Sequence, residues 1–267
     1  MQINKSVLLG IVGVLGMTLG SCALASHKAQ LTADMGYVKL SHLPSGSSKI
    51  NPIRLQALRE TATTLGARGA LAWRSLQITR SLSSEASYLD HVFDFNKLLI
   101  NNDVLPPVIT QSDNDLTLDN SETIRLASKT YKIVSPARFV TAAPTWRTYL
   151  WMSYPKPNMP SKTLLPTTKA EAAVWNMYLQ QGWKQGVAQA NDIFRVNLDR
   201  LKRDYDGIVL YRQLLAQHMV SSPFVAKANL GVTGNGNQIR INDKVLRITS
   251  QSQLQTNSAK WRPVITD

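Results

Sequence analysis

The chain has 267 residues, of which 43% are hydrophobic and 18% are charged. This is the composition of an ordinary globular protein with enough length for a hydrophobic core, and it excludes wholesale disorder, collagen-like repeats and polytopic membrane proteins. A single cysteine excludes a disulfide scaffold and a cysteine-rich zinc or iron–sulfur site. Thirty Lys and Arg residues against seventeen Asp and Glu residues give a net charge of +13, which bears on partners and solubility rather than on fold.

An apolar stretch near the N-terminus predicts an export signal. Lys5 precedes the almost wholly apolar segment Ser6–Leu19. As a helix this segment would be about 21 Å long, too short to cross a hydrocarbon core of about 30 Å comfortably. A short apolar run behind a positive start is typical of a signal peptide. Its removal with Lys5 would leave a net charge of +12 on the mature chain.

The residues after this stretch predict a lipid anchor. Leu19-Gly20-Ser21-Cys22 resembles the lipobox of bacterial lipoproteins, in which the cysteine is lipidated and becomes the first mature residue. The alternatives are an ordinary signal with a chance cysteine, or an uncleaved anchor helix. We predict a lipoprotein signal peptide over residues 1–21 and lipidation at Cys22. Ala23 stands where an aspartate would favour inner-membrane retention, so the outer membrane is expected.

The rest of the chain divides into a tether and one folded part. Residues 22–51 lack sustained periodicity and finish in a Pro/Ser/Gly stretch, which predicts a lipidated N-terminus and flexible tether. A short strand around Tyr37–Leu40 stays open. Residues 52–267 are predicted to form a single globular α+β domain.

Apolar and small residues at three- and four-residue spacings predict two long helices, over residues 53–82 and 169–217. Gly66 and Ala70 lie on one face of the first helix. Gly182, Gly186 and Ala190 repeat this pattern in the second. Small residues at that spacing let another helix approach closely, so we expect the two helices to be in close contact there. The alternative is that these glycines face solvent without consequence.

Two similar segments predict β-hairpins. Residues 123–133 (TIRLASKTYKI) can be laid over residues 238–248 (QIRINDKVLRI), with Ile, Arg, Lys and Ile at four matching positions. In the second segment, an Asn242-Asp243 turn is expected, with Arg240 and Arg247 pointing to solvent. Four apolar residues there are expected to face a core: Ile239, Ile241, Leu246 and Ile248. The predicted fold class is α+β, with long helices packed on a small antiparallel sheet built from two hairpins. Whether both hairpins lie in one sheet stays open.

Motifs for catalysis and metal binding are weak. The four histidines lack the spacing of a zinc motif, and Gly231–Gly236 lacks the Lys-Ser/Thr ending of a phosphate loop and is expected to form a turn. The acidic residues of 113–119 do not complete a calcium loop and predict a solvated loop. Ser153-Tyr-Pro-Lys156 and Ser112-Asp113-Asn114 match penicillin-binding motifs, but in the wrong order and without K-T-G. We predict no catalytic residue, no metal and no cofactor.

Basic residues are scattered rather than gathered into a nucleic-acid groove. The densest group, around Arg195–Arg203, is interrupted by aspartates, as on a solvated helix face. A nucleic-acid partner is therefore not expected. Acidic proteins or an anionic membrane surface account for the charge equally well.

Several segments resemble the DotC family of lipoproteins from type IVB secretion (Dot/Icm) systems, which has counterparts in IncI-type plasmid conjugation. They occur in one order between about Arg54 and Trp261. The segments are Leu58-Arg-Glu-Thr-Ala62, Gly69-Ala-Leu-Ala-Trp73, Val104-Leu-Pro-Pro-Val108, Ala137-Arg-Phe-Val-Thr141, Trp146-Arg-Thr-Tyr-Leu-Trp151, Tyr211-Arg-Gln-Leu-Leu-Ala-Gln217 and Leu230-Gly-Val-Thr-Gly-Asn-Gly236, the last leading into Ile239-Arg-Ile-Asn-Asp243.

This resemblance implies a periplasm-facing structural lipoprotein of the outer-membrane core complex, present in many copies in a ring. Such proteins work beside a small DotD-like lipoprotein and help bring a secretin-like DotH-like subunit to the outer membrane. The family has no catalytic role, so the chain is predicted not to be an enzyme. Two other classes stay open: a periplasmic DNA-contacting protein of a transfer channel, and a cell-wall-modifying enzyme.

A ring subunit needs side-chain anchors for its neighbours, and aromatic residues and arginine dominate interface hot spots. The candidate interface residues are Trp146, Arg147, Trp151, Arg240 and Arg247. The alternative is that the tryptophans fill the core, which is favoured slightly for Trp151. Trp175 and Trp183 are expected in the core.

Overall fold

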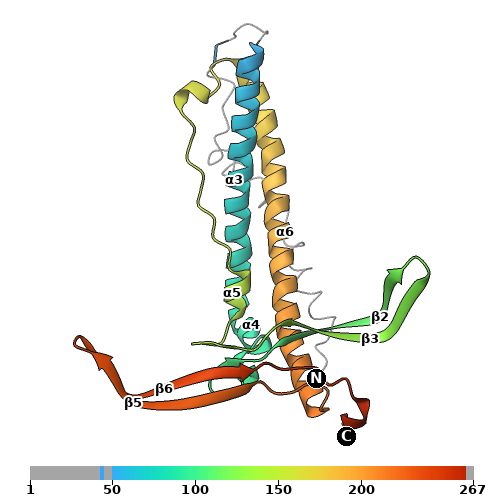
Figure 1. Cartoon of the computed structure of the whole chain (residues 1–267). Coiled ribbons are helices and arrows are strands. Elements are labelled where there is room, and N and C mark those ends of the chain that lie inside the picture. Colours follow the sequence, from blue (N-terminus) through green and yellow to red (C-terminus); the bar gives the residue numbers. More distant parts are fainter. Residues whose placement is uncertain (1–42, 45–49, 263–267) are drawn as a thin grey trace. The chain divides into compact units, whose positions relative to one another are not determined.

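The computed structural model describes residues 43–44 and 50–262 (Figure 1). The predicted signal peptide, Cys22, the strand around Tyr37–Leu40 and most of the tether lie outside the described residues. The described residues form two compact units, one comprising residues up to Ser87 with Leu150–Asn197, the other Tyr88–Tyr149 with residues from Leu198 on. One helix, over Lys169–Ala216, has residues in both units. The single domain over residues 52–267 stays a prediction.

The first unit is built on two long helices, α3 (Pro52–Ser84) and the N-terminal part of α6 (Lys169–Ala216). The side chain of Asn51 caps α3 by accepting a hydrogen bond from the backbone N–H of Ile53. Pro52, whose fixed φ suits a helix start, stands in the first turn. Both predicted helices are therefore confirmed, within two residues of their predicted ends.

Small residues bring α3 and α6 into close contact, as predicted. A methyl group on Gly66 would lie 2.3 Å from the carbonyl oxygen of Leu179, and one on Gly186 would lie 2.1 Å from that of Ala67. Around this contact a core of apolar side chains is buried, and Trp175 lies in it as predicted. The core residues are Leu58, Ala62, Leu65, Trp175 and Leu179.

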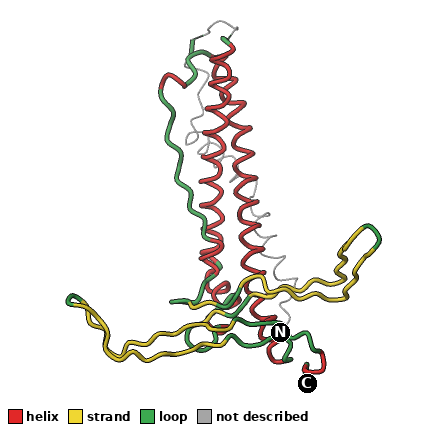
Figure 2. Tube along the Cα trace, in the orientation of Figure 1, coloured by secondary structure: helices red, strands yellow, loops and turns green. Residues whose placement is uncertain are grey.

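The second unit carries the strands, together with the C-terminal part of α6 (Figure 2). Its short elements are α4 (Ala86–Val92, which begins in the first unit), α5 (Trp146–Leu150), and the 3-10 helices η2 (Asn96–Leu98) and η4 (Ser258–Lys260). A further 3-10 helix, η3 (Lys162–Leu164), belongs to the first unit. The strands are β1 (Val104–Leu105), β2 (Val108–Asn120), β3 (Thr123–Ser135), β4 (Arg138–Phe139), β5 (Phe224–Asn235) and β6 (Gln238–Ser250).

The strands pair antiparallel as β1–β4, β2–β3 and β5–β6, in three separate two-stranded sheets. The base of β2 packs on α6, where Gly207 leaves room for Val108 and Ile109. Ile109 joins Tyr211, Leu214 and Val220 of this unit in a buried core. The predicted α+β class, with long helices and small antiparallel hairpin sheets, is confirmed.

The placement of the hairpins corrects several expectations. Residues 123–133 and 238–248 each form one strand, not a hairpin, and they lie in separate sheets. The prediction of a turn at Asn242-Asp243 is wrong. Asn242 has a φ of 58° and lies where the β5–β6 register shifts, which is a β-bulge. Asparagine suits this position because it tolerates a positive φ. The turn is at Gly236 and Asn237, in the segment expected to form one. Residues 113–119, predicted as an acidic loop, lie in β2.

Candidate functional site

Trp146 and Arg147 share one carboxylate partner in the second unit. The indole Nε1 of Trp146 donates a hydrogen bond of 2.7 Å to Oδ1 of Asp90, and Arg147 donates to the same oxygen at 2.6 Å. The Arg147 guanidinium also lies 4.3 Å from the centre of the Trp146 ring, within range of a cation–π contact. The hydrogen bond from Arg147, and then that from Trp146, hold the pKa of Asp90 below its ordinary value.

This arrangement separates the roles of the two residues. The Trp146 side chain is fully buried, so its surface is unavailable to a partner, whereas Arg147 is partly exposed beside Asp90. The sequence did not indicate Asp90, because it lies 56 residues before Trp146 and no spacing rule connects them.

Trp151 has the opposite environment from Trp146. Half of its side-chain surface is exposed, in the irregular segment that follows α5. The preference for Trp151 over Trp146 as the core tryptophan is therefore wrong. Trp183, also expected in the core, is half-buried and contacts the ring of Trp73, with 5.5 Å between the ring centres.

Arg240 and Arg247 are exposed on β6, as expected. Across the hairpin they pair in register with Thr233 and Ala226. Within residues 43–44 and 50–262, neither arginine forms an ion pair, so both guanidinium groups are open to a partner. Their assignment to a partner interface stays a prediction.

The ends of the two long hairpins carry apolar residues whose exposure the sequence analysis did not predict. In β2–β3, Leu116 pairs with Leu126 and Leu118 with Ile124, which places all four side chains on one face. In β5–β6, Val232 pairs with Ile241, and Ile239 lies on the same face opposite Gly234. These seven side chains are 56–75% exposed. We call them the β2–β3 apolar face (Leu116, Leu118, Ile124 and Leu126) and the β5–β6 apolar face (Val232, Ile239 and Ile241).

Two of these residues overturn an expectation. Ile239 and Ile241 were expected to face a core, but they are 70% and 75% exposed. The alternation of apolar and polar residues indicated an apolar face, but both residues lie in the single strand β6, and nothing within the described chain covers that face. In β2, the alternation in Asp115-Leu-Thr-Leu-Asp119 is the signal that could have identified a strand.

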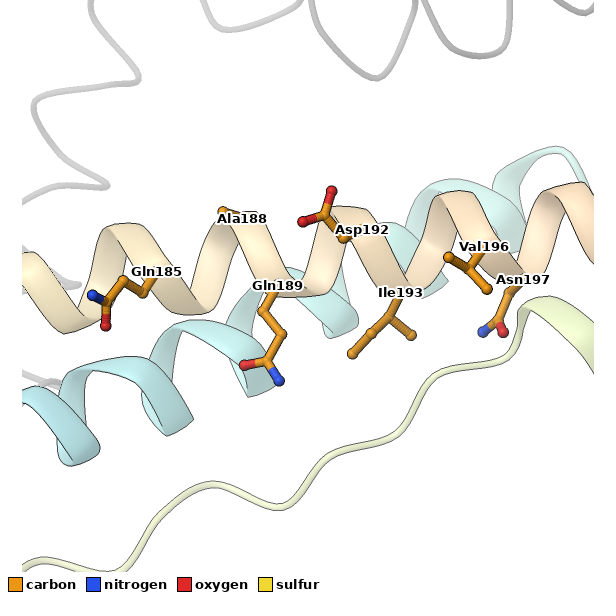
Figure 3. A pocket seen from close by; sticks show the side chains of 7 residues that line it. All are labelled: Gln185, Ala188, Gln189, Asp192, Ile193, Val196 and Asn197. Carbon is orange, nitrogen blue, oxygen red and sulfur yellow. The ribbon is translucent and has the colours of Figure 1, made fainter.

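The weak catalytic motifs are not brought together by secondary structure. Ser153 and Lys156 lie in an irregular segment, and Ser112-Asp113-Asn114 lies in β2. Among the described residues, no group of three or more His, Cys, Asp or Glu side chains could hold a metal ion. A shallow depression on α6 is lined by apolar and amide side chains with Asp192 (Figure 3). Its lining residues are Gln185, Ala188, Gln189, Asp192, Ile193, Val196 and Asn197.

In the part of the chain that the structure describes, no helix combines the length and apolar character needed to span a bilayer.

The fold is α+β, and its two long hairpins expose apolar and basic side chains. Exposed apolar patches are typical of proteins that act by contact with other macromolecules. The family described as "Type IV secretory system, conjugal DNA-protein transfer" (T4SS_TraI) matches residues 52–263. The chain belongs to this family and is a component of a type IV secretion or conjugation system. The comparison with curated proteins gives no match.

Proposed function

We propose that the chain is a DotC-like structural lipoprotein of the outer-membrane core complex in a type IVB secretion or conjugation system. In this proposal Cys22 carries the lipid anchor, and the folded part faces the periplasm. There it recruits and holds a secretin-like, DotH-like subunit, beside a small DotD-like lipoprotein. The protein contributes binding surfaces and has no catalytic role.

The observation that carries the proposal is the family match over residues 52–263, which includes both units of the structure. The lipobox-like Leu19–Cys22 lies outside that range, so it supports a lipoprotein independently. Several buried acyl CH₂ groups, at about 0.8 kcal/mol each, would attach such a chain to the bilayer almost permanently.

The surfaces of the structure suit an assembly subunit. Trp151 is a half-exposed aromatic side chain, and Arg240 and Arg247 are exposed cations without ion pairs in the described residues. Aromatic and arginine side chains contribute most to interface hot spots. Positive side chains also speed association with acidic subunits, an effect that salt weakens.

The test is a pull-down from isolated outer membranes of cells that express the whole secretion system. The tagged wild-type chain is expected in the outer-membrane fraction with the secretin-like subunit attached, and mass spectrometry is expected to find acyl chains on Cys22. The Cys22→Ser variant is the matched control and is expected to lose both. An unmodified Cys22 in the mature wild-type chain would contradict the proposal.

A DNA-binding measurement on the same preparation separates the main rival. The full chain is expected to bind duplex DNA weakly at near-physiological salt. Binding to DNA as tight as binding to the secretin-like subunit, with a steep salt dependence, would favour a DNA-contacting role instead.

A further inference from the structure

Both long hairpins have an apolar face that is exposed, which is unusual for a two-stranded sheet in water. Such a sheet normally gains its stability by packing that face against another layer. The β2–β3 and β5–β6 apolar faces are instead 56–75% exposed. Contiguous exposed apolar patches of more than a few hundred Å² mark interaction sites. Within residues 43–44 and 50–262, neither face is covered by another part of the chain.

The two hairpins carry charges of opposite sign around these faces. Residues 108–135 contain four acidic and three basic residues, a net charge of −1, and Arg125 is held by an ion pair to Asp119. Residues 224–250 contain one acidic and four basic residues, a net charge of +3. The single acid, Asp243, accepts a hydrogen bond from Thr233. The basic residues of this second hairpin are Lys227, Arg240, Lys244 and Arg247.

We propose that the β2–β3 hairpin of one copy of this chain docks on the β5–β6 hairpin of a second copy, apolar face against apolar face. The occupant of each face is the other hairpin because that hairpin offers both an exposed apolar face and a net charge of the opposite sign. Pairing of like hairpins would place like charges together, which costs free energy. An anionic bilayer would repel the acidic side chains of β2–β3.

The contact joins two different surfaces, so in a pair one copy keeps a free β5–β6 hairpin and the other keeps a free β2–β3 hairpin. A contact of this kind propagates, and it closes into a ring if the rotation between copies permits. Figure 2 shows the two hairpins of the second unit reaching away from each other, which leaves both ends free for neighbours. This inference rests on the proposed function in one respect, namely that several copies of the chain assemble together.

The test uses two differently tagged full-length chains, one with Leu118→Cys and one with Ile239→Cys, co-expressed with export to the periplasm. A short bismaleimide is expected to link the two tags at least tenfold more than it links two Leu118→Cys or two Ile239→Cys chains. The wild-type chain reports any linking through Cys22. Equal linking in the like pairs, or no linking between the unlike pair, would overturn the proposal.

Charge reversal with rescue provides the second arm. Arg240→Glu with Lys244→Glu is expected to lower self-association of the detergent-solubilised full chain at least tenfold. Mixing it with a chain carrying Asp113→Lys and Glu122→Lys is expected to restore association, because the opposite signs are then paired again. The matched control is Arg68→Glu with Arg80→Glu on α3, which makes the same change in charge. An equal loss in that control would overturn the assignment to the hairpins.

A third measurement tests the bilayer as occupant. A fluorophore on the Leu118→Cys chain is expected to be unaffected by spin-labelled phospholipid in phosphatidylethanolamine–phosphatidylglycerol vesicles. Strong quenching would overturn the proposal in favour of membrane insertion. Recovery of the secretin-like subunit in the pull-down is a separate readout, so a failure of self-association and a failure of the proposed function can be told apart.

Discussion

Gly182 on α6 faces the carbonyl oxygen of Thr63 on α3 so closely that a methyl group at this glycine would lie 2.1 Å from that oxygen. The obstacle is backbone, which cannot rotate away as a flexible side chain can. Gly182→Ala is therefore expected to push the helices apart and to lower the free energy of unfolding by about 2 kcal/mol, from an overpacking cost of about 1–3 kcal/mol. Urea unfolding of the full chain followed by circular dichroism measures the change.

Gly69 is the matched control for that substitution. A methyl group there would meet the nearest side-chain atom, of Trp183, at 3.5 Å, an ordinary contact. Gly69→Ala should therefore keep the gain in helix propensity of up to about 1 kcal/mol without the clash. Equal effects of the two substitutions would contradict the close contact between α3 and α6.

Glu171, near the start of α6, is a buried carboxylate with several donors. Arg54 donates to its Oε1 at 3.1 Å, and the backbone and hydroxyl of Thr167 donate to its Oε2 at 2.8 and 3.0 Å. Glu171→Gln removes the charge from these hydrogen bonds and should cost about 2 kcal/mol. Thermal unfolding at pH 7 measures this, with the exposed Glu60→Gln as the control of equal charge change.

The pH dependence of stability tests the same carboxylate. The hydrogen bond from Arg54 has the largest effect on the pKa of Glu171 and lowers it below its ordinary value of 4.5. Below pH 4.5 the unfolded chain binds the proton more readily than the folded chain does. The contribution of the Glu171 carboxylate to the free energy of unfolding is therefore complete above pH 4.5, and it is lost as the pH falls through the lowered pKa. The acid decline should be shallower in Glu171→Gln than in the wild type. Parallel acid declines would argue against the ion pair.

The helices could be read from the sequence because their signals are local. The spacing of apolar residues predicted α3 and α6, and the small residues Gly182 and Gly186 indicated where another helix comes close. The hairpins were harder because Asp113 and Asn114 look like a loop although they lie in a 13-residue strand. That strand pairs with β3, and the apolar alternation over Asp115–Asp119 is weaker evidence for it than the loop-like residues are against it.

The surface residues show a second limit of the sequence. Apolar alternation at Ile239 and Ile241 indicated a face that needs a partner, and burial in the same chain was the natural expectation. Trp146 and Trp151 look alike in sequence, but only Trp146 has a carboxylate partner, brought to it from α4 by tertiary structure. Burial and exposure of such residues depend on contacts distant in sequence.

Trp146 and Trp151 are expected to respond differently to truncation. Trp146→Ala removes a fully buried indole and should destabilise the protein by about 3–5 kcal/mol. Trp151→Ala removes a half-exposed one and should change stability by only about 0.5 kcal/mol. If Trp151 is an interface anchor, the same substitution weakens binding to the secretin-like subunit about 30-fold, which corresponds to about 2 kcal/mol. Thermal unfolding and pull-down titration measure the two effects. Unchanged binding with unchanged stability would remove Trp151 from the interface.

Tyr149 is expected to govern part of the alkaline stability. Its hydroxyl donates a hydrogen bond of 3.1 Å to Oδ2 of Asp204. Burial raises the pKa of Tyr149 to about 12, and the negative charge of Asp204 adds to this effect. The unfolded chain releases this proton near pH 10, so the folded state holds it more tightly between about pH 10 and 12. The free energy of unfolding therefore falls as the pH rises through that interval. Tyr149→Phe should be less stable at neutral pH by about 1 kcal/mol, for the lost hydrogen bond, and should show a flatter alkaline decline.

Urea unfolding between pH 8 and 11.5 tests this expectation, with the exposed Tyr154→Phe as the control. Part of the decline should persist in Tyr149→Phe, because burial also raises the pKa of Tyr205. Tyr205 contacts Phe95, which in turn stacks on Tyr149 with 6.0 Å between the ring centres, so the two phenols belong to one aromatic cluster. If Tyr154→Phe flattens the decline as much as Tyr149→Phe does, the alkaline effect is general to tyrosines and the buried Tyr149 hydroxyl is not its cause.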